Sequence, residues 1–162
     1  MALQQVSAWA RNLAGLKLSD DELEAIPYAQ AELSTHITFK TAEAGSILGG
    51  LLIAPITAFF RRGSVEGVSA TRRFGARGLV IGALLGVPMS LLHARQLGYG
   101  QEGAFDRAFR LRHSQSQLMV DRCALGLGGL GLVLGGLSGA SNGINAGVIA
   151  AAVYNNAIKP RL

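Results

Sequence analysis

The feature that most constrains this chain is an uncharged stretch of 36 residues, Cys123–Ile158, which is unusually rich in glycine. Its first part, LGLGGLGLVLGGLSGA at residues 125–140, holds seven glycines in sixteen positions, and all but one of the others are Leu, Val or Ala. A straight helix of this length would measure about 54 Å, whereas the hydrocarbon core of a bilayer is about 30 Å thick. The stretch is therefore expected to fold back on itself at the polar residues within Ser138–Asn145.

Two further uncharged stretches, Ala44–Phe60 and Gly78–Ala94, reach the lower limit of about 17 residues for a membrane span. Only 15% of the residues are charged, against about 25% in a typical soluble domain. These features predict an all-α membrane protein with four short, glycine-rich transmembrane helices in a tight bundle. The alternative is a glycine-rich soluble protein with two buried helical hairpins. The predicted spans are about 42–60, 76–94, 122–139 and 143–158, between an N-terminal segment 1–40 and a C-terminal tail 159–162.

Small residues recur every four positions in the predicted spans. In lipid there is little hydrophobic drive between helices, so association depends on close contact, which small residues four apart permit. Glycine weakens a helix in water by about 1 kcal/mol relative to alanine, but lipid leaves the backbone few alternatives to a helix. The predicted packing residues are Ser46, Gly50, Ala54, Gly78, Gly82, Gly86, Ser90, Gly131, Gly135, Gly139, Gly143 and Gly147.

The basic residues lie mainly at the edges of the apolar stretches. The net charge is +5, but this placement is typical of membrane flanks rather than of a nucleic-acid-binding surface. Residues 101–122 alternate apolar and basic side chains and predict an interfacial helix, with a polar loop as the alternative. Charge counts leave the orientation in the membrane open. The predicted contacts with lipid headgroups or partners are Arg72, Arg73, Arg77, Arg107, Arg110, Arg112 and Arg122.

The first 19 residues are basic, with apolar side chains at helical spacing, and predict an amphipathic helix. Such helices resemble mitochondrial targeting segments or lie in a membrane interface; a helix that docks on a neighbouring protein is the alternative. The sequence SDDE predicts a capping box, with Ser19 as the N-cap and Glu22 at the third helical position. Pro27 should end that helix early.

The sequence offers no convincing catalytic motif. GLGGLG at 126–131 fits a dinucleotide pattern, but no acidic residue follows it. GASNG at 139–143 fits a nucleophile elbow, but no Asp, Glu or His follows it, so a polar hairpin turn is expected there. The three histidines lack metal-site spacing, and Glu43 and Asp121 lie at span edges rather than inside spans. We predict no enzyme, and no catalytic, cofactor or metal residues.

Four short glycine-rich spans with an arginine-rich first loop resemble the mitochondrial inner-membrane translocase superfamily. That group contains the translocase subunits and a related accessory subunit of respiratory complex I. The resemblance covers about residues 41–158 and rests on the ladder from Gly78 to Ser90 and on LGLGGLGLVLGGLSG. FRLRHSQSQLMVDR at 109–122 and VYNN at 153–156 look like a family of small mitochondrial four-span proteins. The paired cysteines of some translocase subunits are missing.

The resemblance implies a multi-pass protein of the mitochondrial inner membrane. The expected function is that of a non-catalytic accessory subunit, with respiratory complex I as the first candidate assembly and other membrane subunits and lipids as partners. No nucleic acid, small-molecule substrate or cofactor is expected, although the basic flanks suit a bound phospholipid such as cardiolipin. Two alternatives remain: a component of an inner-membrane protein translocase, and a lipid-binding protein that shapes membranes.

Overall fold

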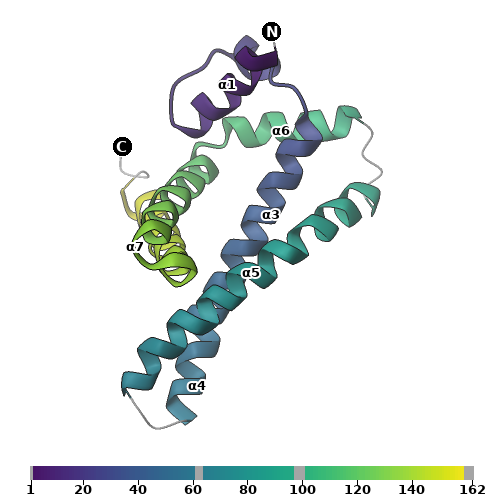
Figure 1. Cartoon of the computed structure of the whole chain (residues 1–162). Helices are drawn as coiled ribbons and strands as arrows, with labels where there is room; N and C mark the ends of the chain where they lie inside the picture. Colours follow the sequence, from purple (N-terminus) through teal and green to yellow (C-terminus); the bar gives the residue numbers. More distant parts are fainter. Residues whose placement is uncertain (1, 61–63, 97–100, 159–162) are drawn as a thin grey trace.

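The computed structural model describes residues 2–60, 64–96 and 101–158, and these residues are almost entirely helical (Figure 1). Two short N-terminal helices precede three long helical segments, and no strand occurs in the described ranges. The helices are α1 (Ala2–Leu13), α2 (Asp20–Glu24), α3 (Ala29–Ile47), the π-helix η1 (Leu48–Ile53), α4 (Ala54–Phe60), α5 (Ser64–Gln96), α6 (Gln101–His113), α7 (Gln115–Val153) and the π-helix η2 (Tyr154–Ile158).

Three segments of the described chain are long and apolar enough to cross a membrane: Ala29–Phe60, Ser69–His93 and Gln115–Ile158. These lengths indicate a multi-pass membrane protein with three long apolar segments, the last of which bends back on itself, instead of the four short helices expected. The first expected span, 42–60, is too short because α3 begins at Ala29 and runs through η1 into α4 without a break. The ring of Pro55 conflicts with a regular helix, and the widened π-helical turn of η1 immediately precedes it.

The long α7 segment reverses direction at two glycines. Gly135 (φ −149°, ψ 21°) and Gly136 (φ 59°, ψ −150°) leave the helical conformation, and the positive φ of Gly136 suits a residue without a Cβ. The two legs of α7 then lie against each other, with Gly143 beside the carbonyl of Leu127 and Gly147 beside that of Cys123 (Figure 1). The chain reverses before the expected position, so the expected span limits at 139 and 143 and the polar turn at 139–143 are wrong.

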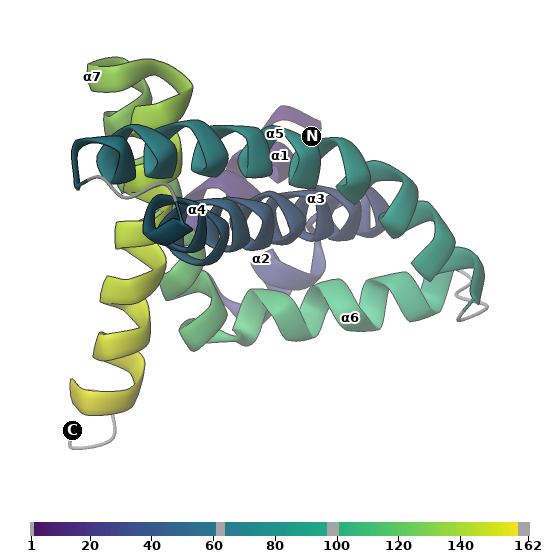
Figure 2. The same ribbon diagram turned by 90° about the horizontal axis from the view of Figure 1, so that it is seen from below.

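Helices α3 and α5 run side by side in opposite directions, and α7 crosses them steeply (Figure 2). Helix α6 lies across the end of this pair at which α3 begins, next to α1 and α2 (Figures 1 and 2). We call α1, α2 and α6 the cap, and α3, η1, α4, α5 and α7 the body. The expected interfacial segment 101–122 is thus divided between α6 and the first turns of α7.

The cap has a small apolar core and a capped helix. Ala8 of α1 packs with Leu23 and Ile26, and Trp9 lies partly buried beside them, so α1 docks on its own chain. The predicted capping box is present: the Ser19 side chain accepts a hydrogen bond from the backbone of Glu22, and the Glu22 carboxylate accepts one from the backbone of Ser19. Helix α2 ends at Glu24, before the proline at position 27.

Candidate functional site

The contact between α3 and α5 is a seam of glycines at which the two backbones touch. A Cβ at Gly45 would overlap the carbonyl oxygen of Gly78, and one at Gly82 would overlap that of Thr41. A Cβ at Gly86 would meet Thr38 in the same way. The buried side chain of Ser90 follows one turn later and donates to its own helix. The three glycines of the expected α5 ladder therefore lie on this seam, and Ser90 is buried one turn beyond them.

Three seam glycines were missed by sequence reasoning: Gly45, Gly49 and Gly75. A Cβ at Gly49 would overlap the carbonyl of Phe74, and one at Gly75 would meet the hydroxyl of Ser141. Gly45 and Gly49 are four residues apart, which is the signal that could have revealed them. The uncharged stretch begins at Ala44 and its expected ladder begins at Ser46, which faces α7 rather than α5.

The remaining expected packing residues lie at other contacts. Ala54 is fully buried, and Gly50 lies against Asn145 and Gly75. Within the α7 hairpin, Gly131 and Gly139 face each other so closely that neither could carry a Cβ, and Gly143 and Gly147 contact the first leg. A Cβ at Gly135 would meet nothing within 4 Å. The expectation that Gly135 packs against another helix is therefore wrong, because it forms the turn.

A group of buried polar side chains joins α3 to the second leg of α7. The Ser46 and Ser141 hydroxyl oxygens are 2.7 Å apart, and the Ser46 hydroxyl lies 2.9 Å from Oδ1 of Asn145. All three residues are at most 5% exposed. Polar side chains that bond across helices in this way stabilise helix association in lipid.

A cluster of ionisable side chains lies nearby, between α3 and the start of α7. Lys40 Nζ lies 2.8 Å from Glu43 Oε2 and 2.5 Å from Asp121 Oδ1, and His36 Nδ1 lies 3.3 Å from Asp121 Oδ2. The Glu43 and Asp121 side chains are only 6% and 7% exposed. Glu43 lies near the middle of the first long helix, so its expected position at a span edge is wrong.

The ionisable cluster contains charged side chains but no nucleophile paired with a base, as covalent catalysis would require. Two carboxylates share one lysine, and His36 contacts one of them. Oε1 of Glu43 is buried without a hydrogen-bond partner among the described residues. The described ranges contain no group of three or more His, Cys, Asp or Glu suited to a metal ion. Charged side chains inside long apolar helices are costly and often mark function.

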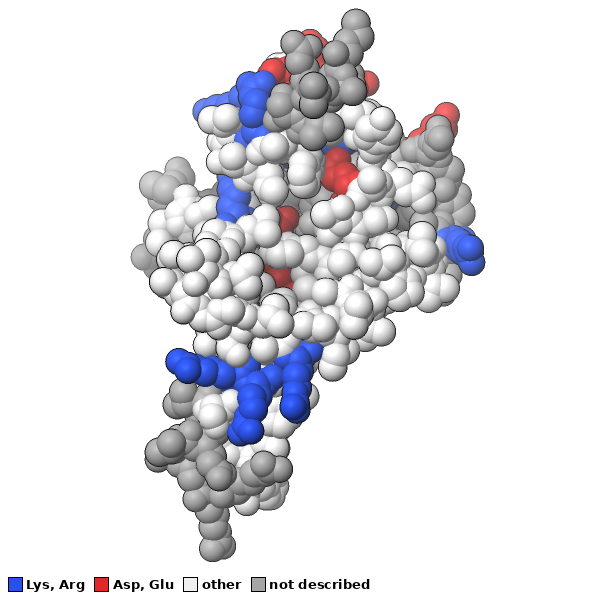
Figure 3. All heavy atoms as spheres, viewed as in Figure 1, with Lys and Arg blue, Asp and Glu red and all other residues white. Residues whose placement is uncertain are grey.

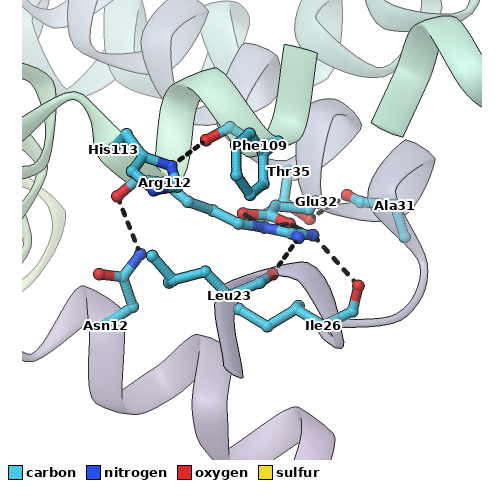
Figure 4. A network of polar contacts seen from close by, with 9 residues as sticks. All are labelled: Asn12, Leu23, Ile26, Ala31, Glu32, Thr35, Phe109, Arg112 and His113. Carbon is cyan, nitrogen blue, oxygen red and sulfur yellow. Dashed lines mark hydrogen bonds and ion pairs between the residues drawn. The ribbon is translucent and has the colours of Figure 1, made fainter. Parts of the chain in front are cut away.

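Two of the predicted headgroup-binding arginines bind groups of their own chain. The Arg112 side chain is completely buried in the cap, where it binds both carboxylate oxygens of Glu32 and donates to the carbonyls of Leu23 (2.6 Å) and Ile26 (3.3 Å; Figure 4). Asn12 in turn donates to the carbonyl of Arg112. The expectation that Arg112 contacts lipid or a partner is wrong, because its three side-chain nitrogens all donate to groups of its own chain.

Arg122 also binds its own chain. Its Nε and Nη2 donate to the carbonyls of Leu13 and Asn12, both at 2.8 Å, in the last turn of α1. Cations near a helix C-terminus satisfy carbonyls that lack a partner within the helix. Arg122 thus attaches α1 to α7, and its expected headgroup role stays a prediction.

The other predicted arginines are exposed in two separate places. Arg72, Arg73 and Arg77 lie together on α5, and we call them the arginine belt. Figure 3 shows a group of basic side chains below a broad, mostly uncharged surface. Arg107 and Arg110 lie on α6 at the opposite end of α5, where they line a cavity of about 760 Å³.

Two titratable groups of the cap have shifted pKa values. The pKa of the Glu22 carboxyl is lowered, chiefly because it accepts a hydrogen bond from the Ser19 backbone. The pKa of His113 is raised, first by its hydrogen bond to the Phe109 carbonyl (2.9 Å) and then by Asp20, at 3.1 Å. Both groups are exposed, so each adds only a small increment to the stability of the cap.

The sequence matches one protein family over nearly its whole length. The match covers residues 9–154, from Trp9 in α1 to Tyr154 in η2, and so includes both the cap and the body. The family is described as "Protein of unknown function (DUF1757)". No curated protein matches the chain. A match of this extent shows that the chain belongs to the DUF1757 family.

Proposed function

We propose that this protein is a non-catalytic accessory subunit of a larger membrane assembly, which it joins through the apolar end of α4. The observation that carries the proposal is the exposure of that end. Ile56, Phe59 and Phe60 are 57%, 81% and 77% exposed. Whether these side chains face lipid or water depends on where the membrane lies.

The exposed arginines support a position for the membrane relative to α5. A charged side chain near the bilayer centre costs roughly 2.5–3.5 kcal/mol even on the lower scales, so the arginine belt belongs at the headgroups. Twenty residues separate Arg73 from His93, which gives about 30 Å of helix, close to the thickness of the hydrocarbon core. Apolar side chains fill the exposed surface between these levels, among them Val80, Ile81, Leu84, Leu85, Val87, Met89, Leu91 and Leu92.

The end of α4 then extends beyond the membrane. Gly50 lies against Gly75, within the arginine belt, and Phe60 follows ten residues later, about 15 Å further along the helix. Large apolar side chains that leave the bilayer without cover are unfavourable in water and mark interaction sites. A partner subunit that covers Phe59 and Phe60 would remove this cost.

Two further features support a structural role rather than an enzymatic one. The buried Ser46, Ser141 and Asn145 bond to one another, so they join helices of the same chain. The glycine seam likewise uses its small residues for internal contact. The resemblance to the translocase superfamily points to the mitochondrial inner membrane, and to respiratory complex I as the first assembly to examine.

The test is comigration on native gels after mild solubilisation of mitochondria, with mass spectrometry of the band that holds this chain. We expect a high-mass band with complex I subunits, and loss of this band for Phe59→Ser/Phe60→Ser. Leu84→Ser is the matched control, because Leu84 is 70% exposed but lies between the two headgroup levels. A protein that migrates alone would contradict the proposal. A band with import components would favour the translocase alternative.

A further inference from the structure

A cavity of about 760 Å³ lies between α3, the end of α5 and α6. This volume falls within the range of roughly 300–1,000 Å³ that is usual for ligand pockets. Its wall has two chemically distinct parts. Leu33, Ile37 and Leu111 provide an apolar part, and His93, Arg107 and Arg110 provide a basic part.

The cavity lies where the apolar surface of α5 ends. Leu91 and Leu92 are each 53% exposed and belong to the apolar surface, and His93 directly after them lines the cavity. Helix α6 crosses this end of the α3–α5 pair and carries the basic residues (Figures 1 and 2). A molecule in the cavity would therefore meet apolar and basic groups at the level at which lipid phosphates meet hydrocarbon.

The basic part of the wall is arranged to accept an anion. Arg107 and Arg110 are three residues apart on α6 and thus neighbours on its surface. Arg107 Nη1 lies 3.2 Å from His93 Nε2, and Arg110 pairs with Asp106 at 2.9 Å. The Arg110 and Asp106 side chains are 77% and 57% exposed, and exposed ion pairs are weak. A phosphate can therefore compete with Asp106 for Arg110, and guanidinium groups bind phosphate through paired hydrogen bonds.

We propose that this cavity binds an amphiphile with an anionic phosphate group, such as an acidic phospholipid. The phosphate contacts Arg107 and Arg110, and the first part of the acyl chain packs on Leu33, Ile37 and Leu111. This site is separate from the end of α4 and requires no partner subunit. Lipid binding can therefore be tested independently of the accessory function.

The test is thermal unfolding of the purified full chain in an uncharged detergent, titrated with one of three probes. These are dioctanoyl phosphatidylglycerol, dioctanoyl phosphatidylcholine and inorganic phosphate. We expect a saturable rise in the unfolding midpoint with phosphatidylglycerol and little change with the other two. Equal stabilisation by both lipids, or by neither, would overturn the proposal. Equal stabilisation by inorganic phosphate would assign the site to a free anion and contradict the amphiphile.

Matched double variants locate the binding site. Arg107→Gln/Arg110→Gln should weaken phosphatidylglycerol binding at least about tenfold, because two charge-assisted hydrogen bonds are lost. Arg72→Gln/Arg73→Gln removes the same charge from the opposite end of α5 and should leave the affinity unchanged. If the first variant does not fold, Arg110→Gln alone should still reduce the affinity, since this exposed side chain does not support the fold. Equal effects of both double variants would show nonspecific attraction and overturn the proposal.

Discussion

Different interactions stabilise the cap and the body of this protein. At the cap, the fully buried Arg112 binds the Glu32 carboxylate of α3 and two carbonyl groups, and Arg122 of α7 binds the last turn of α1. In the body, α3 and α5 meet at glycines whose backbones touch. A small apolar core needs such polar anchors, whereas in lipid close contact between helices provides the attraction. The two regions should therefore fail independently.

The largest expected effect is the release of the cap in Arg112→Met. This change leaves the Glu32 carboxylate and the carbonyls of Leu23 and Ile26 without their shared donor, which should cost about 3–5 kcal/mol. Trypsin should then cut rapidly at Lys17 between α1 and α2, while the body keeps its helix content. Arg110→Met, on the exposed side of the same helix, is the control. Equal protection in both variants would show that Arg112 does not anchor the cap.

Gly78→Leu is expected to destabilise the body and to leave the cap intact. The new side chain would overlap the backbone of Gly45, so the body should lose roughly 3 kcal/mol or more. Gly129→Leu is the matched control, because a Cβ there meets nothing within 4 Å, and it should even stabilise the helix slightly. Thermal unfolding in detergent measures both. A similar loss in the two variants would argue against the seam.

A smaller effect in the body is expected for Asn145→Leu. The substitution removes the hydrogen bond with Ser46 but leaves the contact between Ser46 and Ser141. Single interhelical hydrogen bonds in membranes contribute about 0.6–2 kcal/mol, so the unfolding free energy should fall by about 1 kcal/mol. A loss greater than that of Gly78→Leu would mean that polar bonds, rather than close contact, hold the body together.

The smallest effect is a pH dependence confined to the cap. His113 has a raised pKa, so its contribution is complete below the ordinary value of 6.5 and is lost as the pH rises through the folded-state pKa. Glu22 has a lowered pKa, so its contribution is complete above 4.5 and is lost on further acidification. Protease resistance of the cap should therefore be greatest between these values. His113→Gln should abolish its decline on the alkaline side, and an unchanged decline would exclude His113 as the cause.

Local patterns in the sequence predicted local structure well. The capping box of Ser19 and Glu22 was confirmed because both partners lie within one turn. The length of the last apolar stretch predicts that the chain reverses direction within it. The position of the turn does not follow from length, because the turn forms at Gly135 and Gly136 and not at the polar residues after them. The expectation that Gly135 packs against another helix fails for the same reason.

Contacts between distant parts of the chain could not be predicted in this way. Arg112 and Glu32 belong to different helices, as do Asp121 and Lys40, and no spacing rule connects them. The charges of Lys40 and Glu43 suggest a span boundary in the sequence, although the first long helix continues through them. Lys40 pairs with both Glu43 and Asp121, and these ion pairs offset charge inside the helix and allow it to continue.

The most direct test of the account is the depth of α4 relative to α5 in a bilayer. Trp9 is the one tryptophan in the sequence, so Trp9→Phe gives a background for Leu84→Trp and Phe60→Trp. Lipids brominated deep in their acyl chains quench tryptophan only within the hydrocarbon core. The account predicts strong quenching of the tryptophan introduced at position 84 and little at position 60. Equal quenching at both positions would place α4 inside the membrane and contradict the proposed partner surface.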